Sequence, residues 1–405
     1  MENRNYDIAQ LLQMQACTHC QACAGVCPAV AGSLDGKLSA IWRIEALGRI
    51  LKRRTDFWRR VFRLKPPSPE ELRAFSETVF RCTLCGNCRR VCPVGIDLTR
   101  LWHSLRRDLV DSEAYPGKID MILKNMTESH NVFGEDNEER AGWVEDMPDA
   151  PDHGYVKDRA DIVYFTGCVS SFFPMARQIP MALVRIFDAA GVDFTLLGEE
   201  EWCCGFPLLG AGLGGHLGAL MENNLHAVKA RGAKQVVFAC PSCYRMWQEH
   251  YPPGVGISHV TEFLSGLVNS GRLPLHELDL TVTYHDPCDL GRGAGEYDAP
   301  RDILRAIPGI RFVELARNRG DCSCCGGGGN LEMIDAGLSA KIAANKIEEV
   351  RATGAQAVVT ACQQCVRTMT TYVKRNKVPI QVMDIVQLLH RSVAGGDDKD
   401  RGQAG

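Results

Sequence analysis

The spacing of apolar residues separates a helical first part of the chain from a mixed second part. Apolar residues recur every three or four positions over residues 41–51 and again over residues 98–109, which predicts two amphipathic helices. After residue 160, short runs rich in β-branched and aromatic residues alternate with helical stretches, and they cover residues 161–167, 192–198, 234–239, 278–286, 310–316, 355–361 and 379–385. This alternation predicts α/β layers with a largely parallel sheet.

Charge divides the chain into three parts. Residues 1–110 carry a net charge of +8, residues 111–160 a net charge of −8, and the remainder a net charge of −3. The acidic middle part contains Pro and Gly among its charges, which predicts a surface connector, and its Trp143 and Phe133 indicate that it docks on a neighbouring part of the chain. Because the whole chain has a net charge of −3 and ordinary hydrophobic (45%) and charged (23%) fractions, a disordered chain, a coiled coil and a basic nucleic-acid binder are all disfavoured.

Cysteine is the unusual component, with 19 residues gathered in tight groups. The N-terminus lacks the basic, apolar and small-residue regions of a secretory signal, and no apolar run reaches the roughly 18 residues of a membrane helix. Without export to an oxidising compartment, a disulfide framework does not explain these thiols. We therefore expect a chain that is cytoplasmic, has no transmembrane segment of its own and uses its thiols for chemistry.

The second half contains an internal repeat of about 120 residues. Its cysteines align at offsets of 120, 121 and 122, in the pairs Cys168 with Cys288, Cys203 and Cys204 with Cys324 and Cys325, and Cys240 and Cys243 with Cys362 and Cys365. Asn224 and Asn345 align as well, and Gly-Ala-x-x-Val-Val-x-Ala-Cys ends at both Cys240 and Cys362. A repeat of this length indicates a duplicated domain, because solenoid repeats run about 20–50 residues.

In each copy one cysteine follows a predicted strand and a Cys-x-x-Cys motif follows another. Ligands in open α/β sheets gather at the carboxyl ends of the strands, so we expect five thiols per copy to converge there. The glycine after each Cys-Cys pair, Gly205 or Gly326, lets the backbone approach whatever the thiols hold.

The first half carries the spacing C-x2-C-x2-C-x3-C-P twice, at Cys17, Cys20, Cys23 and Cys27 and again at Cys82, Cys85, Cys88 and Cys92. This is the spacing of bacterial two-cluster ferredoxins, in which the fourth cysteine of each run ligates the other cluster. We therefore assign cluster 1 to Cys17, Cys20, Cys23 and Cys92, and cluster 2 to Cys82, Cys85, Cys88 and Cys27. Structural zinc is the alternative, but zinc explains neither the third cysteine of each run nor the trailing prolines.

Two ferredoxin runs followed by two copies of C…CCG…CxxC resemble the catalytic iron–sulfur subunit of heterodisulfide reductase (its D-type subunit) and its relatives, over residues 10–110 and 160–390. Those relatives include a component of the sulfite-reduction-associated complex and the iron–sulfur subunits of glycolate oxidase and anaerobic glycerol-3-phosphate dehydrogenase. In heterodisulfide reductases such a Cys-Cys-Gly (CCG) domain holds a noncubane 4Fe-4S cluster through five cysteines, and a disulfide is split between two such clusters. The resemblance implies a first catalytic set of Cys168, Cys203, Cys204, Cys240 and Cys243. It implies a second set of Cys288, Cys324, Cys325, Cys362 and Cys365.

The fold implied is α+β overall, an all-α two-cluster ferredoxin domain followed by a duplicated, Rossmann-like α/β pair of CCG domains with mainly parallel sheets. The expected domains are the helical ferredoxin-type domain (1–110), the acidic connector (111–160), two CCG domains (161–280 and 281–395) and a disordered tail (396–405). The implied cofactors are two 4Fe-4S clusters and one or two noncubane 4Fe-4S clusters.

The function implied is an iron–sulfur oxidoreductase subunit that reduces a small disulfide, or oxidises thiols, with electrons relayed through the two ferredoxin-type clusters. Its expected partner is a membrane cytochrome b-type subunit or a flavoprotein, which would place the chain on the inner face of the membrane. One alternative is a non-catalytic relay between a flavin dehydrogenase (glycolate, lactate or glycerol-3-phosphate type) and the quinone pool. A second is a sulfur or metal carrier scaffold. Nucleic acid is not an expected partner.

Three single residues keep two interpretations each. Cys322, the cysteine left over from the four sets, is an accessory thiol or an inert buried residue, and the latter is favoured. His285, beside the predicted ligand Cys288, is a proton donor to a leaving thiolate or a strand-end histidine bonded to backbone. His19 tunes the first cluster or lies at the surface, and surface exposure is favoured.

Two longer motifs are weaker still. Gly210, Gly212 and Gly215 satisfy G-x-G-x-x-G, but no strand precedes them, so a nucleotide site is disfavoured; we expect this stretch and residues 326–329 to wrap clusters. Residues 43–65 are basic and contain Phe57, Trp58 and Phe62, which favours contact with a membrane surface or partner over a simple solvated helix.

Overall fold

The computed structural model describes residues 5–152 and 154–395. Contacts between residues divide it into two units. The first comprises Met1–Leu123, Pro207–Leu217 and Ser323–Lys346, and the second comprises Lys124–Phe206, Gly218–Cys322 and Ile347–Gly405. Two segments from the repeated half of the chain, one in each copy, therefore belong to the same unit as the ferredoxin-type residues. The predicted disordered tail, residues 396–405, lies outside the described residues.

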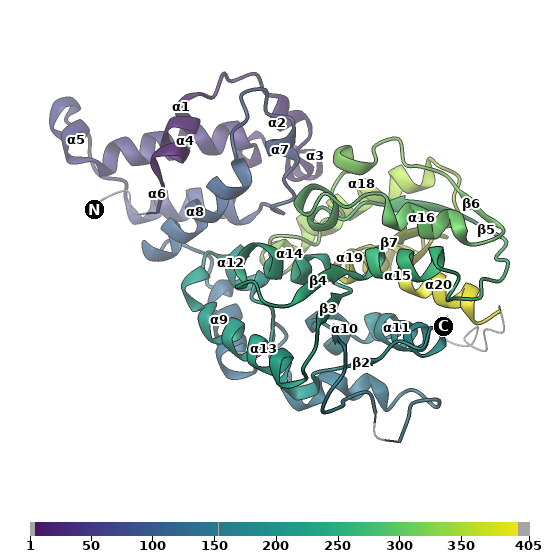
Figure 1. Ribbon diagram of the computed structural model, residues 1–405. Coiled ribbons are helices and arrows are strands. Elements are labelled where there is room, and N and C mark those ends of the chain that lie inside the picture. The colour runs from purple at the N-terminus through teal and green to yellow at the C-terminus, as the bar shows by residue number, and fades with distance from the viewer. Residues whose placement is uncertain (1–4, 153, 396–405) are drawn as a thin grey trace. The chain divides into compact units, whose positions relative to one another are not determined.

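The N-terminal part of the first unit is helical, as its apolar period predicts (Figure 1). Its helices are α1 (Ile8–Gln15), α2 (Ala22–Gly25), α3 (Pro28–Ser33), α4 (Ala40–Arg54), α5 (Asp56–Phe62), α6 (Pro69–Phe80), α7 (Asn87–Arg90) and α8 (Leu98–Asp111). The predicted helices over 41–51 and 98–109 correspond to α4 and α8. Each begins at a capping side chain, because Ser39 accepts a hydrogen bond from Trp42 N and Asp97 accepts one from Arg100 N.

The second unit contains two four-stranded parallel sheets. The first has the order β2-β1-β3-β4, with β1 (Ile162–Phe165), β2 (Phe194–Thr195), β3 (Gln235–Phe238) and β4 (Gly256–His259). The second has the order β6-β5-β7-β8, with β5 (Leu280–His285), β6 (Ile310–Phe312), β7 (Ala357–Thr360) and β8 (Gln381–Asp384). Seven of these strands lie in the predicted runs and only β4 was not predicted. The shared strand order confirms the internal repeat.

The strand register places the two repeats in equivalent positions. Phe165 pairs with Phe238 at the end of β1 and β3, and His285 pairs with Thr360 at the end of β5 and β7. Because all the strands are parallel, their carboxyl ends lie at one edge of each sheet. The first cysteine and the Cys-x-x-Cys motif of each copy follow these ends, as the sequence predicts.

Helices flank both sheets, and one apolar cluster contains buried residues of both (Figure 1). Those of the second unit are α10 (Cys168–Phe172), α11 (Gln178–Ala189), α13 (Gly218–Ala230), α14 (Pro241–His250), α15 (Val260–Asn269), α16 (Ala299–Ala306), α19 (Gln363–Asn376) and α20 (Ile385–Val393). The remaining helices are α9 (Lys118–Glu128), α12 (Phe206–Ala211), α17 (Leu331–Ile334) and α18 (Ala336–Arg351). Helices α11 and α20 contribute Leu183, Phe187 and Leu388 to the cluster.

The acidic connector contributes to this core. Its 3-10 helix η2 (Asn137–Val144) buries Trp143, which belongs to the apolar cluster with Met147 and Tyr155. Phe133 lies against the Phe172 ring, with 6.2 Å between ring centroids. The prediction that the connector docks is therefore confirmed, whereas a purely superficial course is wrong for these residues. Among the described residues, no helix combines the length and apolar character needed to cross a membrane.

Candidate metal centres

The first ferredoxin loop gathers its thiols with the last cysteine of the second run. Cys17, Cys20 and Cys23 line one pocket together with Cys92. Its other walls are apolar, formed by Ile41, Ile44, Pro93, Val94, Ile96 and Leu98 among others. Cys27, which is closer in sequence, is not among the lining residues. The geometry thus agrees with the crossed grouping expected from the spacing.

The second group combines Cys27 with the first three cysteines of the second run. Burial raises the pKa of the Cys27 thiol to about 11, with Arg43 opposing the shift and Cys82 and Cys85 adding to it. Burial likewise raises the pKa of Cys88 well above its usual value, and Cys82, Cys85 and Cys27 raise it further. These interactions bring Cys27, Cys82, Cys85 and Cys88 into one neighbourhood.

The two ferredoxin loops share an unusual backbone conformation. The residues two and four positions after the first cysteine are left-handed in both loops: His19 (φ 57°) and Gln21 (φ 64°) in the first, Leu84 (φ 54°) and Gly86 (φ 75°) in the second. In the second loop the Leu84 amide donates to Cys82 Sγ at 3.4 Å. Non-glycine residues in this region are strained, and such strain clusters at ligand sites. Only Gly86 marked the conformation in the sequence.

The first CCG set lies wholly in the second unit, and its five thiols form an unbroken series of contacts. Cys168 is hydrogen-bonded to Cys203, Cys203 to Cys204, Cys204 to Cys243, and Cys243 to Cys240. All five are buried. Hydrogen bonds from the Cys203 and Cys243 thiols lower the pKa of Cys204 to about 6. A buried cluster of soft thiol donors fits iron in an iron–sulfur cluster.

A buried ion pair borders this set. Arg140 Nη1 donates to Glu201 Oε1 at 2.8 Å, and both side chains are 1% exposed. The Arg140 guanidinium nitrogens lie 3.8 and 3.9 Å from Cys168 Sγ. Glu201 accepts the backbone N–H groups of Thr166 and Gly167 at 2.7 and 2.8 Å. The pair therefore fixes the turn between β1 and Cys168 and places a positive charge beside that sulfur.

The sequence analysis missed both members of this pair. Arg140 lies in the connector, where one basic residue among acidic ones carries no signal. Glu201 precedes Cys203 by two residues, but the repeat offset of 121 aligns it with Cys322. The comparison of the repeats therefore showed no shared acidic residue at this position.

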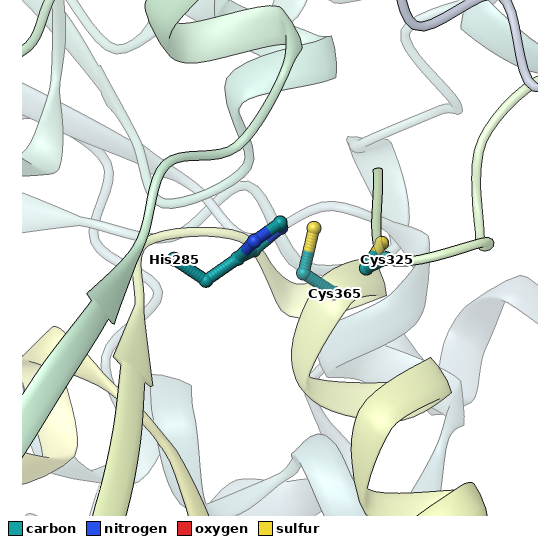
Figure 2. Close-up of side chains that lie close together, drawn as sticks. All are labelled: His285, Cys325 and Cys365. Carbon is teal, nitrogen blue, oxygen red and sulfur yellow. The ribbon is translucent and has the colours of Figure 1, made fainter. Parts of the chain in front are cut away.

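The cysteines of the second CCG set are divided between the two units. Cys288, Cys362 and Cys365 belong to the second unit, while Cys324 and Cys325 lie in the Ser323–Lys346 segment of the first. Figure 2 shows His285 at the end of its strand and Cys365 on its helix, and their ligand atoms lie within 4.8 Å of each other.

His285 also contacts the cysteine that the four sets leave over. Its Nδ1 lies 3.4 Å from the sulfur of Cys322, which is 0% exposed. The backbone oxygen of His285, not its ring, accepts a hydrogen bond from Thr360. The strand register aligns His285 with Phe165, so the first repeat has no equivalent imidazole.

The two glycine segments of the repeats contact the ferredoxin part of the first unit. A Cβ on Gly329 (φ +61°) would lie 2.8 Å from the carbonyl carbon of Thr83, and one on Gly212 (φ +85°) would lie 2.6 Å from the backbone of Arg106. Only glycine permits this approach. Cys324 Sγ accepts a hydrogen bond from Gly326 N at 3.3 Å in the same unit.

Two weaker sequence signals lie at the surface. His19 is 56% exposed and its Nδ1 lies 2.8 Å from Glu45 Oε1, which agrees with the surface interpretation. In the basic stretch 43–65, Phe57 and Phe62 are 63% and 59% exposed. The side chain of Trp58 lies outside the described residues.

Comparisons with known proteins agree with these groupings. The 4Fe-4S dicluster domain family matches residues 13–96, and the cysteine-rich domain family matches residues 162–248 and again 282–370. The D-type subunit of dihydromethanophenazine:CoB–CoM heterodisulfide reductase is 34% identical in Methanosarcina mazei and 33% identical in Methanosarcina barkeri, over 96% of both chains in each case. The EtfAB:quinone oxidoreductase of Syntrophomonas wolfei is 31% identical over 78% of this chain and 47% of its own length.

A dicluster domain joined to a duplicated cysteine-rich domain defines an iron–sulfur oxidoreductase subunit that transfers electrons. Within that class, the identity over nearly the whole chain is decisive. The chain belongs to the family of D-type heterodisulfide reductase subunits.

Proposed function

We propose that the four cysteine groups hold four iron–sulfur clusters. Cluster 1 is held by Cys17, Cys20, Cys23 and Cys92, and cluster 2 by Cys27, Cys82, Cys85 and Cys88. Each CCG set holds one noncubane 4Fe-4S cluster. The domain boundaries expected from the sequence and the Rossmann-like description of the CCG domains remain part of this proposal.

We further propose that the chain reduces a small disulfide, or oxidises the corresponding thiols, at the CCG sets. The observation that carries this proposal is the unbroken contact series of five buried thiols from Cys168 to Cys240 at the carboxyl ends of β1 and β3. A mononuclear four-coordinate metal needs only four ligands. Five thiols therefore favour a larger, multi-iron centre.

The bound clusters would supply iron that binds sulfur and accepts or donates single electrons. The chain's own residues would prepare the site. Arg140 places its guanidinium beside Cys168, where it offsets the negative charge of a thiolate. Glu201 holds the preceding turn through two backbone amides. The buried position of all five sulfurs excludes water from them.

The heterodisulfide reductase relatives also support the proposal about substrate and partner. Their names describe a reductase of a heterodisulfide that is built from more than one kind of subunit. For this chain we propose a small thiol or disulfide substrate. A membrane cytochrome b-type subunit or a flavoprotein is the proposed electron partner.

The alternative of an electron relay without its own substrate is favoured by one comparison. The Syntrophomonas relative is named for quinone reduction. In that case the CCG sets would pass electrons between a flavin dehydrogenase and the quinone pool, and no thiol would alter their clusters. The scaffold alternative predicts CCG sets without iron.

The test is electron paramagnetic resonance (EPR) of anaerobically purified protein, oxidised with and without small thiols. Disulfide chemistry predicts a paramagnetic species that appears only with thiol. Cys243→Ser, which removes one sulfur from the first set, should weaken it while the dithionite-reduced ferredoxin-type signals persist. Cys322→Ser is the matched control, since this cysteine lies outside all four proposed sets, and it should keep full iron content.

The outcomes separate the three functions. A spectrum that is indifferent to every thiol, in protein with a full complement of iron, would favour the relay. Iron in the ferredoxin-type sites but absent from the CCG sets would favour the scaffold. Zinc in place of iron would overturn all three.

A further inference from the structure

Arg106 is a buried cation that no acidic side chain balances. It lies on α8 and is 0% exposed. Its terminal nitrogens donate to backbone carbonyls of Val79, Phe80, Cys82, Gly210 and Gly329. Among the described residues it has no carboxylate partner, and its Nε has no hydrogen-bond partner. Burial lowers the pKa of Arg106 to about 10, so the side chain remains charged at neutral pH.

A second buried arginine faces the same group of thiols. Arg43 on α4 is 2% exposed, donates to the carbonyl of Thr78 and lies over the Trp102 ring. Its Nε is also without a partner. Electrostatic attraction to Arg43 favours the thiolate form of Cys27, and the Cys82 thiolate favours the charged form of Arg106.

Carbonyl dipoles alone do not explain two such charges. A buried guanidinium loses its hydration and is unfavourable unless an opposite charge compensates it. A cluster held by four thiolates carries net negative charge, which increases by one unit with each electron accepted. Arg106 donates to the backbone oxygen of Cys82 at 2.7 Å, which places it next to that charge.

We propose that Arg106, with Arg43, is the countercharge of cluster 2 and raises the reduction potential of that cluster. Reduction adds an electron to the cluster, and a fixed positive charge favours the more negative, reduced state. The inference rests on the ligand set proposed above for cluster 2. It does not depend on the disulfide chemistry of the CCG sets.

Cluster 1 provides a comparison within the same unit. The pocket lined by Cys17, Cys20, Cys23 and Cys92 has mostly apolar walls. Within the described part of the chain, its one charged or titratable lining side chain besides cysteine is His19, which is exposed and paired with Glu45. Removing the charge of Arg106 should therefore act on cluster 2 and leave cluster 1 unchanged.

A purely structural role for Arg106 must be separated from an electrostatic one. The carbonyls of Gly210 and Gly329 belong to the segments that follow the two Cys-Cys pairs, so Arg106 also holds these segments together. Asn330 links the same segments without a charge, because its Nδ2 donates to Pro207 O at 3.0 Å. Asn330→Ala is thus a matched control for loosened packing.

The experiment is an anaerobic redox titration of the full chain, with the two ferredoxin-type signals followed by EPR. Cys82→Ser and Cys17→Ser identify which signal belongs to cluster 2 and which to cluster 1. In Arg106→Met, at a fixed potential, we expect at least a tenfold lower ratio of reduced to oxidised cluster 2, a shift of about 59 mV for one electron. Arg106→Lys should keep most of the wild-type potential. Asn330→Ala and the exposed neighbour variant Arg107→Met should leave both potentials unchanged.

Each result decides the question. An unchanged cluster 2 potential in Arg106→Met, with both signals intact, would overturn the inference and leave the proposed function standing. So would an equal shift in Asn330→Ala. If Arg106→Met does not assemble, Arg43→Met removes the second charge and is expected to lower the same potential, and no change there would overturn the inference. A Cys82→Ser chain that keeps both signals would instead overturn the proposed ligand set.

Discussion

Arg140 and Glu201 show how much one buried residue from the connector contributes to the first CCG set. The two side chains form a 2.8 Å ion pair at 1% exposure, and the same guanidinium contacts Cys168. Breaking a buried pair by removing one partner is strongly unfavourable, because the other charge is left in a medium of low dielectric. Exposed pairs contribute much less.

Arg140→Met should therefore destabilise the second unit strongly. We expect the free energy of unfolding to fall by about 3–5 kcal/mol, since Glu201 loses its partner. Urea denaturation followed by tryptophan fluorescence measures this, because Trp143 lies in the core close to Arg140 in sequence. The control is Arg311→Met, which breaks the exposed pair with Asp279 and should cost at most about 1 kcal/mol. Equal losses in the two variants would contradict the argument.

Asp384 predicts a second effect, on the pH dependence of stability. Its Oδ1 caps α20 by accepting from Val386 N, while its Oδ2 is buried without a partner. Burial raises the pKa of Asp384 from 3.8 to about 7. The folded state thus holds a proton that the unfolded state releases above pH 4, so stability falls as the pH rises from about 4 to about 7.

Asp384→Asn should remove this loss while keeping a cap acceptor. Relative to wild type, we expect the variant to gain stability between pH 5 and pH 8, by up to about 4 kcal/mol for a shift of about three units. Denaturation midpoints at both pH values measure the gain. Asp136→Asn changes an exposed cap of η2 and should show no comparable trend. A parallel pH profile for wild type and Asp384→Asn would rule the effect out.

The sequence predicted the ligands at this scale better than the charges around them. Cysteine spacing alone predicted that Cys92 joins the first loop and Cys27 the second, and the structure brings these residues together as expected. Arg106, Arg140 and Glu201 carried no such signal. A charged residue is ordinarily solvated, and its burial beside a sulfur depends on packing between segments far apart in sequence.

At the scale of elements, the glycine segments of the first unit are tightly constrained turns. Gly212 has φ +85°, and a Cβ there would lie 2.6 Å from the backbone carbonyl of Arg106 on α8. A backbone atom cannot move aside as a flexible side chain can. The turn therefore has both a left-handed conformation and no space for a side chain.

Gly212→Ala should cost more than the left-handed conformation alone explains. An alanine in that region costs about 1–2 kcal/mol, and overpacking adds about 1–3 kcal/mol. The control is Gly191→Ala after α11, where φ is +60° and nothing lies within 4 Å of the added Cβ. Thermal unfolding of both variants measures the difference. If Gly191→Ala is as unstable as Gly212→Ala, close packing at Gly212 is not the cause.

The elements themselves were predicted where the pattern was regular. The apolar period predicted α4 and α8, and β-branched runs predicted seven strands. Strand β4 was missed because Gly256–His259 contains Ser258 and His259 instead of an apolar run. His259 is nevertheless 0% exposed and caps α15 through a hydrogen bond from Thr261 N. Its burial depends on tertiary packing that local composition does not encode.

At the scale of the whole chain, the crossing of the two ferredoxin runs links segments about 65 residues apart in sequence. Cys92 lines the pocket of the first loop, while Cys27 interacts with Cys82, Cys85 and Cys88. Each proposed cluster thus needs both runs, which makes the helical part a single cooperative metal-binding element. Because ligands must be brought together to bind metal, binding and folding are coupled.

This crossing predicts which single variants resemble each other. Cys92→Ser should alter the same EPR signal as Cys20→Ser, and Cys27→Ser the same signal as Cys85→Ser, although each of these pairs joins cysteines from different runs. The physical reason is that a cluster with one thiolate replaced by a hydroxyl changes its potential and relaxation or is lost, while the other keeps its four thiolates. Dithionite-reduced spectra of the four variants, with Cys322→Ser as a control that alters neither signal, measure this. If Cys27→Ser instead resembles Cys20→Ser, each run holds its own cluster, and the proposed ligand sets, together with the countercharge assigned to Arg106, would have to be exchanged.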